Sequence, residues 1–268
     1  MAQTFSEAIS WSPAEPGIYE HLVGSDWFQG RGAFGGLAAG AAVRAMEDRV
    51  DSTEHRIRAL NVQFCGPLVA APATMSVEVV RRGSSVINAQ ARIEQEGQAK
   101  TTATATFARD RHSASDFEQL AMPEVPPPEE VATAPDSPLF PKFARYYEYK
   151  FCFGEIPFSS SDEAAVGGWC RLRDSDESVD AAHAAALLDL WPPAVLTRAD
   201  SPTAAATISW QVLFHDPLPL ADAGADDFYL VAATTSQTLG GYAEERADLW
   251  SADGRRVAQG MQLVAIFG

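Results

Sequence analysis

The chain has 268 residues, of which 46% are hydrophobic and 21% are charged, and its formal net charge is −16. This composition is typical of a globular protein with one large domain or two of ordinary size, each able to bury a core. The negative charge argues against nucleic acid or an anionic membrane as the main partner, because both repel an acidic surface. A small anionic ligand held by a local basic cluster is compatible with it.

The sequence carries few signals for metals, cofactors or export. Cys65, Cys152 and Cys170 are too scattered for a disulfide framework or a Cys-x-x-Cys metal site, so we expect reduced core thiols. The five histidines show no ligand spacing, and no phosphate-binding loop or nucleophile elbow is present; we therefore expect neither a metal nor a cofactor. The N-terminus lacks the features of a signal peptide, and no apolar run is long enough to span a membrane, which favours a cytoplasmic protein.

The first half of the chain predicts a helix followed by an antiparallel meander. After a lead-in with strand character at 17–23, small residues in segment 30–50 suit a helix packed against a sheet, buried at its start and wet at its charged end. The period then changes to two in four segments separated by turn signals. These segments are 57–64, 73–83, 84–97 and 98–108. A helix followed by such a meander is an α+β unit.

The second half repeats this order after a Pro-rich, acidic segment that we interpret as an extended linker. Strand segments near 146–153 and 168–173 precede an apolar helix, and four more follow it, at 205–214, 227–237, 241–250 and 255–267. The turns at Pro67 and Pro217 are related by 217 − 67 = 150, and those at Gly97 and Gly254 by 254 − 97 = 157. We interpret the chain as an internal duplication, with copies at 1–110 and 146–268 joined by a linker at 111–145.

The helix of the second copy is the first candidate for a functional element. Ala181 to Val195 is apolar on every side, as in a helix buried in a core, and it carries one carboxylate, Asp189, before Pro192 and Pro193 end it. Burial raises the pKa of a carboxyl group and is costly unless the group is paired, hydrogen-bonded or used. Asp189 either reaches solvent or a backbone amide at the helix end, or serves as a functional base.

Polar residues on two strands could join Asp189. Alternation along 205–214 places Thr207, Ser209 and Gln211 on one face, opposite Trp210, and Gln262 lies in an otherwise apolar row of the last strand. Each polar residue alone could satisfy a backbone group or reach solvent. Together with Asp189, they could hold and activate a water molecule.

Such a site would also need a donor for a developing oxyanion. The backbone N–H groups of Gly35 and Gly36, where the first helix begins, are suited to this role. A plain helix cap that uses glycine for a tight turn explains the same residues.

These motifs resemble the acyl-CoA thioesterase II family of double hotdog proteins. The similarity rests on AFGGLAAGAAVRAM, FCGPL and VVRRGSSV in the first copy and on ATISWQVLFHDPL and VAQGMQLVAIF in the second. It covers almost the whole chain apart from the Pro-rich linker. It implies an α+β double hotdog, in which each copy has a long helix wrapped by an antiparallel sheet and the two sheets join into one surface.

The resemblance also implies a function and a site. The family binds its attacking water with an Asp on the second helix, a Thr on the following strand and a Gln on the last strand, which here fall on Asp189, Thr207 and Gln262, with Ser209 as the fallback for Thr207. It implies an enzyme that hydrolyses fatty acyl-CoA to free acid and CoA, and a homo-oligomer. Arginines that could hold the CoA phosphates are Arg31, Arg56, Arg58, Arg81 and Arg82.

Two other functions stay open from the residues alone. A non-catalytic acyl-CoA or acyl-carrier binding protein would keep the fold without releasing thiol. A hotdog dehydratase would need a His beside the carboxylate, and His183 lies six positions from Asp189, off the same helix face.

Overall fold

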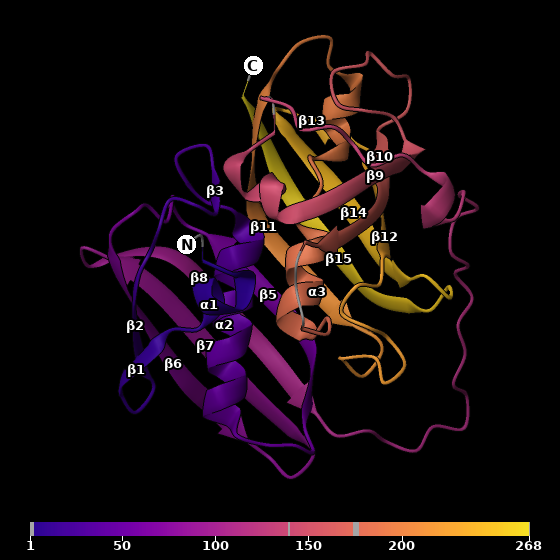
Figure 1. Ribbon diagram of the computed structural model, residues 1–268. Coiled ribbons are helices and arrows are strands. Elements are labelled where there is room, and N and C mark those ends of the chain that lie inside the picture. The colour runs from indigo at the N-terminus through magenta and orange to yellow at the C-terminus, as the bar shows by residue number, and fades with distance from the viewer. Residues whose placement is uncertain (1–2, 139, 174–176, 268) are drawn as a thin grey trace.

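A computed structural model describes residues 3–138, 140–173 and 177–267. Its main feature is one long antiparallel sheet that wraps around two helices lying side by side (Figure 1). This is the α+β architecture that the resemblance implies, with one helix and one meander in each copy.

The first copy follows the predicted order. A short helix, whose N-terminus is capped by Thr4, opens it, and the central helix α2 precedes the four-stranded meander. Helix α2 is buried through most of its length, and Asp48 and Arg49 near its end are exposed, as predicted. The elements are α1 (Phe5–Ile9), β1 (Ser12–Glu15), β2 (Ile18–Leu22), β3 (Phe28–Gln29), β4 (Gly32–Ala33), α2 (Gly35–Val50), β5 (Arg56–Phe64), β6 (Pro72–Arg82), β7 (Val86–Gln95) and β8 (Gln98–Ala108).

The second copy differs in its helix, which is shorter than predicted. It ends at Leu188 rather than near Pro192, and the chain continues through a short 3-10 helix, η3, before the strands resume. The elements after β8 are η1 (Pro128–Glu130), η2 (Lys142–Tyr146), β9 (Tyr147–Gly154), β10 (Ala165–Leu172), α3 (Ala181–Leu188), η3 (Ala194–Arg198), β11 (Ala204–Phe214), β12 (Tyr229–Thr234), β13 (Thr238–Leu239), β14 (Tyr242–Ser251) and β15 (Arg256–Phe267).

The strand order of the sheet is the same in both copies, read outward from its centre. It runs β1-β2-β6-β7-β8-β5 in the first copy and continues β11-β15-β14-β12-β10-β9 in the second. The central pair, β5 and β11, follows the helix in each copy, and the outer strands β2 and β10 precede it. This symmetry is what an internal duplication predicts, and it brings the two helices together on one face of the sheet.

The two helices pack closely because small residues line their contact. A Cβ atom added at Gly36 would lie 2.9 Å from Ala186 Cα, and one added at Gly40 would lie 3.4 Å from Ala182 O. Glycine at these positions therefore brings α2 into direct contact with the backbone of α3. The predicted tight packing of α2 thus occurs against the second helix as well as against the sheet.

Replacing Gly36 with Ala is expected to destabilise the protein. The new Cβ would lie 2.4 Å from a ring carbon of Phe34, besides its contact with Ala186. Overpacking of this kind costs about 1–3 kcal/mol, which exceeds the roughly 1 kcal/mol that Ala gains over Gly in a helix. Urea denaturation should show a lower midpoint. Gly224→Ala, in an exposed loop where the added Cβ meets nothing closer than 3.8 Å, is the control.

The segment between the copies has no strand among its described residues, but it does not run free in solvent. Met122, Val125 and Val131 pack on a cluster formed by Trp169, Leu230 and Trp250 on the second copy. The Trp169 indole also donates a hydrogen bond to Pro126 O, at 2.8 Å. The Pro-rich stretch that cannot fold alone is therefore ordered by the aromatic surface on which it lies.

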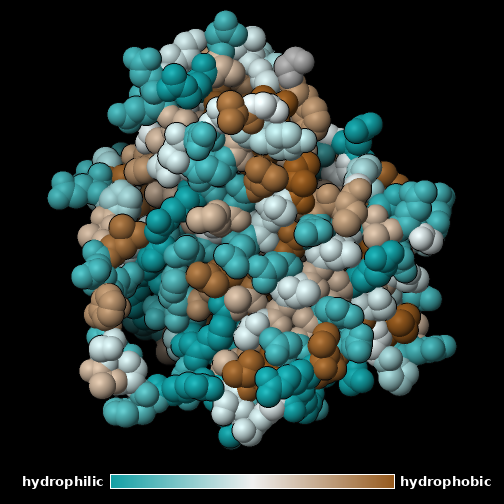
Figure 2. All heavy atoms as spheres, turned by 180° about the vertical axis from the view of Figure 1, so that it is seen from behind, coloured by the Kyte–Doolittle hydropathy of each residue, from teal (hydrophilic) through white to brown (hydrophobic). Residues whose placement is uncertain are grey.

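Side chains on the outer face of the sheet are mixed in polarity. Figure 2, seen from behind, shows apolar side chains scattered among hydrophilic ones. Ile208, Met261, Leu263 and Phe267, on β11 and β15, are exposed.

Cys65 is exposed as well, so the prediction that all three cysteines lie in the core is wrong for this residue. It sits in the turn after β5, where the alternation that buries strand residues has ended.

Candidate active site

Asp189 lies at the junction of the two helices. It is the C-cap residue of α3, and its Oδ2 accepts a hydrogen bond of 2.6 Å from the backbone N–H of Gly36, in the first turn of α2. Of the two interpretations left open, the one with Asp189 bound to a backbone amide describes its contact, but the amide belongs to the other copy. The first N–H groups of a helix have no intrahelical partner and favour an anion.

The protonation of Asp189 is set mainly by burial. Desolvation raises the pKa of the carboxyl group from 3.8 to about 7, and the hydrogen bond from Gly36 opposes this rise. The residue nevertheless keeps partial contact with solvent. A desolvated carboxylate with a pKa near neutrality is suited to accept a proton from water.

Thr207 faces the interior because of a β-bulge. The ladder between β11 and β15 pairs Thr207 with Val264 and Ser209 with Leu263, and the extra residue between them, Ile208, is exposed. The prediction that Thr207 and Ser209 share a face is therefore wrong: Thr207 lies with the buried Val264, and Ser209 lies opposite Leu263, on the outer side. The bulge turns Thr207 toward the helices and leaves the fallback residue away from them.

Thr207 and Gln262 are in direct contact. The Thr207 hydroxyl donates to Gln262 Oε1 at 2.7 Å, and the Gln262 side chain is buried in the apolar row that the sequence predicts. A buried Gln in this row needs hydrogen-bond partners, and Thr207 is one of them. Helix α3 packs on β14 and β15, which brings Asp189 to the same region as this pair.

Glu245 is a further member of the site that the sequence analysis missed. It lies on β14 directly opposite Gln262, is 2% exposed, and accepts hydrogen bonds from Gln262 Nε2 and from the backbone N–H of Ala194. Burial raises the pKa of Glu245 to about 7, the two hydrogen bonds lower it, and the charge of Asp189 raises it further. The signal was readable: in the row Ala243, Glu245, Ala247, one carboxylate alternates with small apolar residues.

The two carboxyl groups make stability depend on pH. Because Asp189 and Glu245 have a higher pKa in the folded state than in the unfolded chain, the folded state binds their protons more tightly. The stabilisation is complete below the unfolded pKa of about 4 and is lost as the pH rises through about 7. Asp189→Asn removes one of these groups. We expect urea denaturation to find the variant more stable, relative to wild type, at about pH 8 than at about pH 5; an equal difference at both values would contradict this.

Gly35 and Gly36, the pair predicted to bind an oxyanion, both lie at the site, but their contacts differ. The N–H of Gly36 is engaged by Asp189, so in this structure it orients the carboxylate. Gly35 is partly exposed, and a Cβ atom added to it would lie 2.7 Å from Asp189 Oδ2 and 2.9 Å from Phe64 Cζ. Glycine is therefore required at position 35 for the carboxylate to lie where it does.

The remaining candidate residues lie elsewhere or are already paired. His183 Nδ1 is 2.8 Å from Asp180, so its carboxylate partner is not Asp189. Arg56 and Arg58 both contact Asp110, just before the linker. Among the described residues, no group of three or more His, Cys, Asp or Glu side chains could hold a metal ion.

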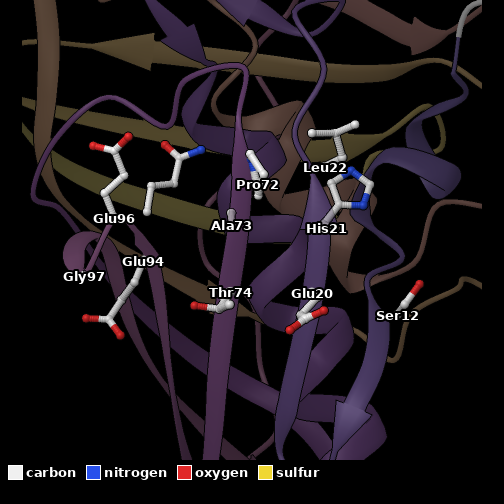
Figure 3. Close-up of a pocket in the computed structure, with 11 residues that line it drawn as sticks. Ser12, Glu20, His21, Leu22, Pro72, Ala73, Thr74, Glu94, Glu96 and Gly97 are labelled. Carbon is white, nitrogen blue, oxygen red and sulfur yellow. The ribbon is translucent and has the colours of Figure 1, made fainter.

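A separate groove lies at the far edge of the first copy (Figure 3). Its walls come from β2, from β6 and from the turn between β7 and β8, and it is lined by His21 and by three glutamates, Glu20, Glu94 and Glu96. It shares no residue with the polar set around Asp189.

Within the part of the chain that the structure describes, no helix is long and apolar enough to cross a membrane.

The fold, in which two helix-and-meander copies share one sheet, defines a double hotdog protein. The two family models that match the sequence describe the N-terminal domain of acyl-CoA thioesterases, over residues 23–108, and their C-terminal domain, over residues 118–266. The chain therefore belongs to the acyl-CoA thioesterase family and is a thioester hydrolase. The comparison with curated proteins gives no match.

Solved structures share the fold over the whole chain. A hot dog protein of unknown function from Alicyclobacillus acidocaldarius is 27% identical, with a TM-score of 0.89 and coverage of 100% of this chain and 99% of that one. An acyl-CoA thioesterase II from Mycobacterium marinum is 20% identical, with a TM-score of 0.77 and 98% of both chains covered. A tesB protein of Mycobacterium avium subspecies paratuberculosis is 17% identical, with a TM-score of 0.79 and the same coverage. The predicted double hotdog fold is confirmed.

Proposed function

We propose that the protein hydrolyses fatty acyl-CoA to free acid and CoA, and that Asp189 activates the attacking water. The observation that carries this proposal is the Asp189 carboxylate itself, which belongs to a half-buried residue, is held by the N–H of Gly36 and has a pKa of about 7 because of desolvation. Thr207 and Gln262, bonded to each other on neighbouring strands, are the groups that hold the water.

In the proposed reaction, Asp189 takes a proton from water as the water oxygen bonds to the thioester carbonyl carbon. The carbonyl oxygen becomes an oxyanion, which we propose is stabilised by the N–H of Gly35, an amide at the start of α2 that Asp189 does not use. Collapse of this intermediate breaks the carbon–sulfur bond, and the proton on Asp189 passes to the leaving thiolate. The products are the free acid and the thiol of CoA.

The acyl chain is proposed to lie beside helix α2. A slot lined by Trp27, Leu37 and Leu68 adjoins the start of this helix, and its volume of about 10 Å³ is room for about one water. An acyl chain would have to part these side chains. We therefore expect chain length to affect the rate strongly.

The test is release of free thiol from a panel of acyl-CoA thioesters from short to long chains, with wild type beside Asp189→Asn. Release that depends on Asp189 supports the proposal and gives the substrate range. If the folded protein releases no thiol from any member of the panel, acyl-CoA is not its substrate. Thiol release by Asp189→Asn at the wild-type rate would instead refute the role of Asp189.

A further inference from the structure

Glu245 is a buried carboxylate without a cationic partner among the described residues. Its two oxygens are occupied separately, one by the side-chain amide of Gln262 and the other by the backbone N–H of Ala194 at the start of η3. Burying such a group is costly unless it is hydrogen-bonded or used. The same carboxylate on an exposed position of this strand would avoid that cost, so its position inside the site calls for a function.

The acceptor role of Glu245 fixes which groups donate and which accept in the hydrogen bonds from Gln262 to Thr207. An ionised carboxylate only accepts, so Gln262 must present its NH₂ group to Glu245 and its carbonyl oxygen to Thr207. The single hydroxyl proton of Thr207 is then used on Gln262. Only the lone pairs of the hydroxyl are left to face a further partner.

We propose that Glu245 is a positioning residue that fixes the Gln262 amide and, through it, makes the Thr207 hydroxyl an acceptor for the attacking water. This inference rests on the proposed function. A water that gives one proton to Thr207 and the other to Asp189 has both O–H bonds fixed, and its lone pairs face away from both. Its nucleophilic lone pair is thereby aimed by two acceptors before the substrate carbonyl arrives.

The protonation state of Glu245 decides whether Gln262 and Thr207 keep these donor and acceptor roles. The groups whose charges act on it are Asp189 from α3 and Glu244 from its own strand; the neighbours Gln262 on β15 and Ala194 on η3 contribute hydrogen bonds without charge. A protonated Glu245 could donate, the amide of Gln262 could then turn over, and Thr207 would face its NH₂ group. The hydroxyl proton of Thr207 would then be free to donate to the water, and the hydroxyl would no longer be held as an acceptor.

The experiment exchanges the two side chains. Ala194 and Gln262 bond to different oxygens of Glu245, and the amide in Glu245→Gln has only one oxygen. When this oxygen accepts from Ala194, the NH₂ group faces Gln262, whose amide turns over to accept from it; we expect kcat to fall roughly 10- to 100-fold with little change in KM. In Glu245→Gln combined with Gln262→Glu, the amide at 245 accepts from Ala194 and donates to the carboxylate at 262, which again accepts from Thr207. The double variant is expected to recover most of the lost kcat.

Glu244→Gln is the matched control. It makes the same change one position along β14, where the side chain accepts hydrogen bonds from Ser236. The charge of Glu244 raises the pKa of Glu245, so its removal favours the ionised form of Glu245, and kcat should not fall below that of the wild type. Circular dichroism reports folding of each variant. Wild-type kcat in folded Glu245→Gln, or a folded double variant no more active than the single one, overturns the proposal. If the single variant does not fold, the double variant decides, because it restores every hydrogen bond. An inactive wild type would instead refute the proposed function.

Discussion

Replacing Asp189 with Asn is expected to lower kcat for acyl-CoA hydrolysis by about 10²- to 10⁴-fold, the usual contribution of a general base. The amide keeps an oxygen that can accept from Gly36 N–H, and it removes a charge from a poorly solvated position, so the fold should be retained. KM should change little, because the carboxylate acts on the water rather than on the bound thioester.

The pH profile distinguishes loss of a base from loss of structure. With a pKa of about 7, Asp189 is half ionised near neutrality and becomes fully ionised at higher pH, so kcat/KM of the wild type should rise with pH through about 7. The residual kcat/KM of Asp189→Asn should lack the part of this rise with pH that comes from ionisation of Asp189. Asp200→Asn, which changes an exposed carboxyl group, should behave as wild type. Unchanged activity in Asp189→Asn would refute the mechanism.

Replacing Gly35 with Ala should lower kcat by about 10²-fold, since displacement of a reacting group by about 1 Å can have that effect. The added Cβ would lie 2.7 Å from Asp189 Oδ2 and 2.9 Å from Phe64, so the carboxylate must move away from its position. Alanine favours the helix over glycine by roughly 1 kcal/mol, which offsets part of the strain, and the melting temperature should change little. Thiol release and thermal melting measure the two effects separately.

Gly224→Ala is the control for this substitution, because its Cβ has open space in an exposed loop. It should keep the wild-type kcat. If Gly35→Ala also kept the wild-type kcat, the close approach of Gly35 to Asp189 would not matter for the reaction. A crystal structure of the variant would then show whether Phe64 moves in place of the carboxylate.

The strands and the duplication could be predicted because both depend on local pattern. The alternation in β5 to β8 predicts half-buried strands, and the repeated turns at Gly97 and Gly254 align the two meanders. The sheet order then follows from pairing equivalent strands. The offset of 157 places Ala105 of the first copy where the second has Gln262 (262 − 157 = 105). The offset of 150 places Ile57 where the second copy has Thr207 (207 − 150 = 57). Only the second copy therefore supplies these polar groups.

The details of the site depend on features without a local signal. The β-bulge at Ile208 reverses the expected face of Thr207, and no glycine in 205–214 marks it. The hydrogen bond between Asp189 and Gly36 joins residues 153 positions apart, which alternation and periodicity cannot relate. Glu245 differs, because its place in an apolar row could have been read from the sequence.

The hydrogen bond between Asp189 and Gly36 also divides the requirements on the two copies unequally. The second copy contributes the groups proposed to act on water, whereas the first contributes the start of α2, which holds the carboxylate in place. Neither half would retain this arrangement in isolation. Selection on activity should therefore bear on the glycines of one copy and the polar side chains of the other, and joining both in one polypeptide ensures that every molecule contains one of each.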